Sequence, residues 1–265
     1  MGIPGAQPPW DMVMNSTGQV IFTVFVIIPW VALIALAVRA LLRDRQAAPM
    51  LFLLGGACSI VMEPVVDVMG MCFFPLHGQW VGLETFAGRP VPMFMWPVYS
   101  WFVGGQAFLL WRMLQRGNMT GRRLWTHWFT AWGVNIVLET PGVLMGVYTY
   151  YGAQPFNFWG LPLWWPAVNA TMPIVAAFLV HMSMPYLRGW RLLAIVPLAP
   201  MADGLVNGGL AWPTWSALHS DIGYAATYPA SLVTLGLAML AVWVLANHLP
   251  KQAPASTEER VQVAA

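Results

Sequence analysis

The chain has 265 residues, of which 58% are hydrophobic and only 8% are charged, and its formal net charge is +2. A soluble domain carries about a quarter charged residues, so this composition excludes a water-covered globular domain and indicates an integral membrane protein. The net charge is small and the arginines lie in short clusters, so we expect no nucleic-acid partner.

The first 19 residues, MGIPGAQPPWDMVMNSTGQ, lack the basic segment that opens a cleaved signal peptide. We therefore expect residues 1–19 to form a retained extracytoplasmic leader. Hydrophobic runs of about 20 residues follow, each long enough to cross a bilayer. They predict spans at 20–42, 50–72, 92–114, 125–147, 162–185, 192–211 and 225–249. The polar remainder, 250–265, is predicted to be a disordered cytoplasmic tail behind a single domain at 20–249.

The basic residues predict the orientation of these spans, because cytoplasmic loops are rich in Arg and Lys. Arginines follow the first span and fill the loops after the third and fifth, Lys251 follows the seventh, and only Arg89 falls on the opposite side. The expected fold is therefore all-α: a polytopic bundle of seven transmembrane helices in a bacterial inner membrane. Its N-terminus lies outside and its C-terminus lies in the cytoplasm.

Four acids fall inside the predicted spans, where an ionisable group costs about 3 kcal/mol on insertion scales. They are Glu63, Asp67, Glu139 and Asp203. Polar residues pair with i, i+4 spacing, which puts both members on one helix face. The pairs are Glu63 with Asp67, Asn135 with Glu139, and Asp203 with Asn207. Since Tyr99 and Asn169 lie at a similar depth, we expect one shared polar cavity in the outer half of the bundle.

A structural role and a cofactor-binding role are both open to these acids. Buried carboxyls can act only as hydrogen-bonded links between helices. They can also serve a cofactor, but retinal needs a lysine within a span, and the only lysine is Lys251. Haem between helices usually needs paired histidines, and His181 is the only histidine inside a span. A metal held by Asp203, Asp67 and Glu63 is conceivable, but these acids have no spacing that is diagnostic of a metal site. We therefore expect neither a metal nor another cofactor.

A family resemblance rests on the run E-T-P-G-V-L-M-G-V-Y-T-Y-Y-G, residues 139–152, and on F-W-G-L-P-L-W-W, residues 158–165. These runs resemble the AveC-like spirocyclase family of actinobacterial membrane proteins. The matching residues are Glu139, Gly146, Tyr148, Tyr150, Pro162, Leu163 and Trp164. The Glu63–Pro64 pair, with Asp67 after it, resembles an acidic-Pro element on an earlier family helix. The likeness covers about residues 60–180. It implies closure of a lipophilic dihydroxyketone to a spiroketal with loss of water.

A weaker resemblance links the chain to the membrane-integral terpene cyclases of fungal meroterpenoid pathways, which are also heptahelical and carry intramembrane acids. Both chemistries need a carboxylic acid and a carboxylate around a lipophilic small molecule. We place Glu63 and Glu139 as the acid/base pair, with Asp67 and Asp203 adjusting them. The substrate-binding residues expected beside them are Asn135, Asn169, Tyr99, Tyr148, Trp164 and Asn207.

A non-enzymatic alternative also accounts for intramembrane acids. A heptahelical binder or proton-coupled transporter of a small lipophilic molecule would use them as a proton relay. The sequence has no clear inverted repeat of the kind found in many transporters, so we favour the enzyme.

Overall fold

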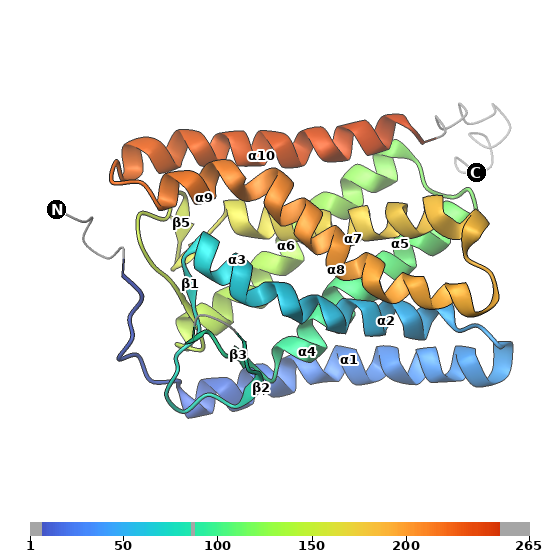
Figure 1. Ribbon diagram of the computed structural model, residues 1–265, viewed down its shortest axis with the longest axis horizontal. Coiled ribbons are helices and arrows are strands. Elements are labelled where there is room, and N and C mark those ends of the chain that lie inside the picture. Colours follow the sequence, from blue (N-terminus) through green and yellow to red (C-terminus); the bar gives the residue numbers. More distant parts are fainter. Residues whose placement is uncertain (1–6, 86–87, 250–265) are drawn as a thin grey trace, which may run out of the picture.

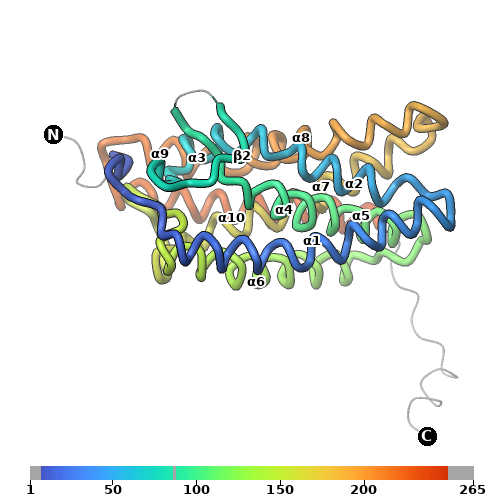
Figure 2. The backbone as a smooth tube through the Cα atoms, turned by 90° about the horizontal axis from the view of Figure 1, so that it is seen from below, coloured from blue at the N-terminus to red at the C-terminus, as the bar shows by residue number. Residues whose placement is uncertain are grey.

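The computed structural model describes residues 7–85 and 88–249, and these are predominantly helical (Figure 1). Within them, seven helical rods run side by side, four of which are built around one long α-helix. These four are α1 (Ser16–Asp44), α6 (Gly121–Leu144), α7 (Trp164–Ser183, continued by the 3₁₀ turn Met184–Tyr186) and α10 (Tyr224–Asn247). The rods form one bundle, as the tube in Figure 2 also shows.

The other three rods are interrupted by tighter or wider helical turns. One comprises α2 (Ala48–Cys58), a 3₁₀ segment (Ser59–Met62) and α3 (Glu63–Gly70). The next comprises α4 (Met95–Tyr99), the π-helical segment η3 (Ser100–Gly105) and α5 (Gln106–Gln115). The last comprises a 3₁₀ segment (Gly189–Ala194), α8 (Ile195–Val206), the π-helical segment η6 (Asn207–Ala211) and α9 (Trp212–Leu218).

Five of the described rods are long and apolar enough to cross a membrane, which agrees with a membrane protein. They are Ser16–Asp44, Ala48–Gly70, Trp164–Tyr186, Gly189–Leu218 and Tyr224–Asn247. The remaining two, 95–115 and 121–144, occupy the positions of the third and fourth predicted spans. Arginines at their ends and polar residues within them lower their hydropathy.

Short antiparallel strands lie at or near the end of the bundle where α1 begins (Figure 1). They pair as β1 (Cys72–Phe73) with β4 (Thr149–Tyr150), β2 (Val81–Leu83) with β3 (Val91–Pro92), and β5 (Asn157–Phe158) with β6 (Leu161–Pro162). The segment directly before α1 packs on these loops: the Met14 amide donates to the His77 carbonyl over 2.8 Å. α1 begins at Ser16, inside the segment 1–19 that the sequence assigns to a leader. The predicted tail at 250–265 lies outside the described residues.

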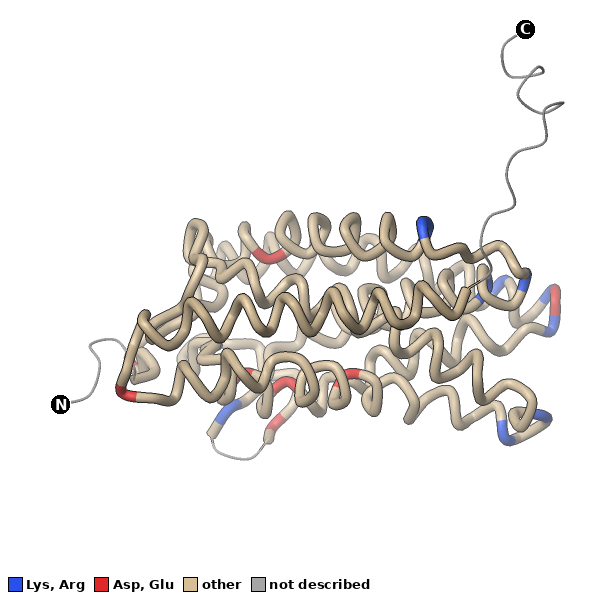
Figure 3. The backbone as a smooth tube through the Cα atoms, turned by 90° about the horizontal axis from the view of Figure 1, so that it is seen from above, with Lys and Arg blue, Asp and Glu red and all other residues tan. Residues whose placement is uncertain are grey.

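The basic residues are unevenly distributed along the bundle axis (Figure 3). Within the described residues, most arginines gather at the end opposite the strands, where α1 and α5 finish and α6 begins, while Arg89 lies beside the strands. Four acidic residues, Glu63, Asp67, Glu139 and Asp203, are buried inside the bundle, whereas Asp44 lies among the arginines at the end of α1. This uneven distribution of arginines is the pattern that the positive-inside rule associates with a cytoplasmic face.

Glycines bring the second and third rods into backbone contact. A Cβ added to Gly104 would lie 2.2 Å from the Phe52 carbonyl oxygen, and one added to Gly56 would lie 2.6 Å from the Gly104 nitrogen. The Ser100 hydroxyl also donates to the Leu53 carbonyl over 2.8 Å. Small residues permit this close packing in membrane helices, and here it brings Tyr99 against the start of α3.

Candidate functional site

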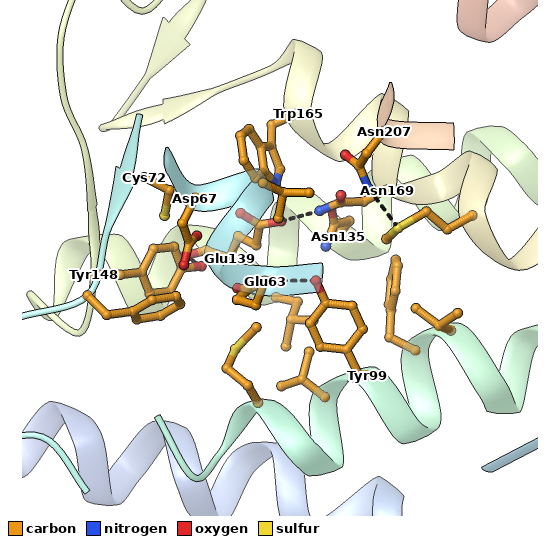
Figure 4. Close-up of a pocket in the computed structure, with 18 of the residues that line it drawn as sticks. Glu63, Asp67, Cys72, Tyr99, Asn135, Glu139, Tyr148, Trp165, Asn169 and Asn207 are labelled. Carbon is orange, nitrogen blue, oxygen red and sulfur yellow. Dashed lines mark hydrogen bonds between the residues drawn. The ribbon is translucent and has the colours of Figure 1, made fainter. Parts of the chain in front are cut away.

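A cavity lies between α3, the η3 rod, α6, α7 and η6, close to the strand-covered end (Figure 4). It encloses about 630 Å³ together with its open mouth, and the centre of a water molecule can move through about 60 Å³ of it. Three of the four expected acids, Glu63, Asp67 and Glu139, line this cavity. The prediction of one shared polar cavity therefore agrees with the geometry for these three residues.

Glu139 has the most hydrogen bonds of the acids lining the cavity. The Tyr150 hydroxyl donates to its Oε2 over 2.6 Å, and the Asn169 amide donates to its Oε1 over 3.0 Å. The same Asn169 amide also donates to Oδ1 of Asn135 over 3.0 Å. The Tyr148 hydroxyl donates to the Glu139 backbone carbonyl over 3.1 Å. Both carboxyl oxygens of Glu139 thus face donors, an arrangement that suits a proton acceptor.

Glu63 faces the same cavity from the first turn of α3. Its Oε2 accepts a hydrogen bond from the Tyr99 hydroxyl, which comes from the end of α4. Each glutamate is therefore fixed by a tyrosine from a different segment: Tyr99 holds Glu63 (Figure 4), and Tyr150 holds Glu139. The two pairs present one carboxyl each to a common space.

Asp67 and Cys72 line the cavity on the side of the strands. The buried Oδ1 of Asp67 has no hydrogen-bond partner among the described residues. Burial raises the pKa of the Cys72 thiol well above its ordinary value, and the charge of Asp67 adds to this effect. Cys72 therefore stays protonated at neutral pH and does not offer a thiolate nucleophile.

Two expected site residues lie outside the cavity lining. Asp203 is fully buried; its Oδ1 accepts from the Asn207 amide over 2.7 Å, while its Oδ2 has no partner among the described residues. Trp164 is packed in the core, with its indole N–H 3.4 Å from Oε1 of Gln154. Asn207, which bonds Asp203, does line the cavity. The other expected residues that line it are Glu63, Asp67, Glu139, Asn135, Asn169, Tyr99 and Tyr148.

Tyr150 and Trp165 line the cavity although neither was assigned to the site from the sequence. Tyr150 could have been predicted from its spacing to Tyr148, since residues i and i+2 of a strand face the same side. Trp165 is seated on Gly70, where an added Cβ would lie 1.7 Å from the indole ring. A sequence of two adjacent tryptophans does not indicate which of them faces the cavity.

Irregular helical turns adjoin the polar residues of three rods. The 3₁₀ segment ends directly before Glu63, η3 begins directly after Tyr99, and η6 begins at Asn207. Proline contributes to these breaks because it lacks an N–H and cannot continue the preceding hydrogen-bond pattern; Pro64 follows Glu63, and Pro213 follows η6. Wide turns of this kind are frequent at functional sites.

Among the described residues, the lining of the cavity contains carboxyl groups but no arginine or lysine. Arg89 is the cation nearest to these loops: it is 8% exposed, donates to the Tyr151 hydroxyl over 3.4 Å, and stacks on Trp10 and Phe73 at 4.8 and 5.1 Å. It does not line the cavity. Within the described residues, no three His, Cys, Asp or Glu side chains are grouped as metal ligands. The cavity is thus an acid-rich, aromatic-walled space.

Comparison of the chain with models of protein families, with curated proteins and with solved structures finds no match. The resemblance to AveC-like spirocyclases therefore stays a hypothesis, supported by the residues that carry it.

Proposed function

We propose that this chain is a seven-span membrane enzyme that cyclises a lipophilic polyketide or isoprenoid by acid–base catalysis. Its N-terminus would lie outside and its arginine-rich end in the cytoplasm, in keeping with the positive-inside rule. The observation that carries the proposal is the pairing of Glu63 and Glu139 across one cavity, each held by a tyrosine.

The roles of the two glutamates follow from their partners. Glu139 accepts from Tyr150 and Asn169, so we assign it as the general base. The reaction then needs a proton donor on the other side of the substrate, and this role falls to Glu63. Asn135 and Asn207, which also line the cavity, would orient substrate oxygen atoms.

Glu63 and Glu139 together can supply and remove every proton that spiroketal closure requires. Glu63 gives a proton to the hydroxyl of a hemiketal, and that hydroxyl leaves as water. A second hydroxyl of the substrate attacks the resulting oxocarbenium carbon, and Glu139 takes its proton. Proton exchange between the two glutamates through water restores the starting state. In the isoprenoid variant, Glu63 protonates an epoxide or olefin and Glu139 removes a proton after ring closure.

The walls of the cavity suit a flexible, lipophilic chain. Aromatic residues such as Phe74, Tyr148 and Trp165 face it, and their rings stabilise a developing cation. Pockets for drug-sized ligands measure about 300–1,000 Å³. The space open to a water molecule beside the glutamates is much smaller than this, so a substrate must displace side chains to fit there. Met95 and Met172 line the cavity and are flexible enough to adjust.

A second function, a proton-coupled binder or transporter, is favoured by one observation. Oδ1 of Asp67 and Oδ2 of Asp203 are buried without partners among the described residues, as proton-relay groups would be. We rank it below the enzyme because neither aspartate carries the paired donors that hold Glu139.

The test compares membranes that contain the wild type, Glu139→Gln or Glu63→Gln. The membranes are incubated with dihydroxyketones and with polyprenyl epoxides, and cyclised products are measured by mass spectrometry. Either variant should lower turnover by about 100-fold or more, as loss of general acid–base help does. Glu84→Gln makes the same chemical change at an exposed position and should keep full activity.

Two results would contradict the enzyme. Folded Gln variants that retain wild-type turnover would reduce the carboxyls to structural links. A wild type that forms no cyclic product, but takes up the probe into vesicles with a proton, would establish the transporter.

A further inference from the structure

A second polar pocket lies at the arginine-rich end of the bundle, far from the carboxyl cavity. It encloses about 880 Å³ with its open mouth and is formed by the start of α6 and by α5. Arg122, Arg123 and Thr120 form its polar part, whereas Leu110 and Met113 give it an apolar wall. The pocket therefore combines positive charge with an apolar surface.

The positive charge of this pocket is largely unneutralised by the local contacts. Arg123 uses one guanidinium N–H on the Asn118 carbonyl over 2.5 Å, so most of its donors remain for another group. The Nε2 atom of His127 is buried at the pocket and has no hydrogen-bond partner among the described residues. The N-terminal end of α6 adds the positive end of a helix dipole. These features together suit an anion.

An apolar groove continues along α6 towards the middle of the bundle. It encloses about 690 Å³ with its open side and lies between α6, Phe25 of α1 and Trp101 of η3. Its α6 residues include Thr130, Gly133 and Val137, which follow Arg123 and Thr126 at intervals of three or four residues. Residues at this spacing share one helix face, so the basic pocket and the apolar groove follow each other along α6.

This face of α6 is only partly covered within the described residues, since α6 packs mainly against α7 and α10 and only weakly against α1. Val137 is 68% exposed, and a Cβ added to Gly133 meets no atom within 4 Å. From Arg123 to Gly133 the helix rises about 15 Å. That distance equals about half of a bilayer core 30 Å thick, so the groove matches one leaflet.

We propose that this composite site binds one anionic phospholipid, with its phosphate at Arg122 and Arg123 and an acyl chain in the groove beside Gly133. The commitment to an anionic lipid rests on charge complementarity at one end and on the apolar groove at the other. Basic pockets between helices at the cytoplasmic side bind such headgroups. The proposal is independent of the cyclase, since no residue of the carboxyl pairs takes part.

The experiment uses the purified full chain, stripped of lipid in detergent and mixed with equal amounts of phosphatidylglycerol and phosphatidylcholine. Native mass spectrometry then counts the bound lipids. Phosphatidylglycerol should bind in clear preference. Arg122→Gln should weaken its binding about fivefold, the effect expected of one basic residue at a membrane surface. Arg191→Gln removes the same charge from another rod and should leave binding unchanged.

Filling the groove tests the acyl-chain half of the site. Gly133→Phe should reduce binding of the phospholipid, whereas Gly236→Phe, at an equally open position on α10, should not. Two outcomes overturn the proposal. One is equal binding of the two lipids, or unchanged preference in Arg122→Gln. The other is full displacement of the lipid by soluble glycerol phosphate with no effect of Gly133→Phe, which would identify a site for free anions.

Discussion

Tyr150 donates its hydroxyl to Oε2 of Glu139 over 2.6 Å, and so joins strand β4 to a carboxyl that lies eleven residues earlier on α6. Burial raises the pKa of Tyr150 well above its ordinary value, and the charge of Glu139 adds to this effect. The phenol therefore remains a donor at neutral pH. The rotamer of the proposed base depends on a residue outside its own helix.

Tyr150→Phe should lower turnover by about tenfold or more, because a hydrogen bond to a charged group contributes about 1.5–3 kcal/mol. The ring should keep its place, since it packs edge-on against Trp165 with centroids 5.4 Å apart. Tyr148→Phe is the matched control: its hydroxyl bonds the backbone carbonyl of Glu139 and not the carboxyl. Product formation, measured by mass spectrometry, should fall much less in the control. Equal losses in both variants would argue for general disturbance of the loop.

Asp203→Asn should impair turnover far less than Glu139→Gln. An asparagine at 203 still accepts from the Asn207 amide, whose 2.7 Å bond is the contact that orients the cavity-lining residue. The partnerless Oδ2 is replaced by an amide group of similar size. The test compares the turnover rates of Asp203→Asn and Glu139→Gln in the same membrane assay. A loss at Asp203 as large as that at Glu139 would bring Asp203 into the proton-transfer machinery.

Gly104→Ala should destabilise the folded protein by about 1–3 kcal/mol, the usual cost of overpacking. The new methyl group would lie 2.2 Å from the Phe52 carbonyl oxygen, which is backbone and cannot move alone. Gly133→Ala has open space around it and should be neutral or stabilising by up to about 1 kcal/mol through helix propensity. Thermal unfolding of the two variants in detergent measures the difference. If they melt together, close contact between α2 and η3 is not required for stability.

Reporter fusions test the orientation. A reporter active only in the cytoplasm should give signal when fused after Gly117, in the loop between α5 and α6. It should be silent when fused after Ser220, between α9 and α10, because that loop lies at the opposite end of the bundle (Figure 1). The expectation follows from the arginine-rich end. Signal at Ser220 and none at Gly117 would reverse the proposed topology.

Much of the architecture is readable from the sequence because membrane helices are long, apolar and self-contained. The positions of the seven helical segments and the i, i+4 pairs were predicted in this way, and Asn207 does bond Asp203. Contacts made by loops were less accessible, since the pairing of β1 with β4 depends on how distant segments meet. For the same reason Tyr150 was not assigned to the site, and Trp164 was chosen over Trp165. Asp203 matched the acid pattern of the other rods, but pattern alone does not give the distance to a cavity.

The β1–β4 pairing has a consequence for how this chain can vary in length. Cys72 pairs with Tyr150 and Phe73 with Thr149, so the segment that leaves α3 is hydrogen-bonded to the segment that leaves α6. These backbone hydrogen bonds fix how far apart α3 and α6 lie at this end of the bundle. The distance therefore depends on the number of residues in each of the two segments. Insertion or deletion of one residue between Leu144 and Tyr150 would shift β4 and turn Tyr150 towards the opposite face of its strand, whereas the same change between Gly70 and Phe73 would shift β1 and turn Cys72. Evolutionary change in chain length is therefore expected in other loops, while these two segments keep a fixed number of residues.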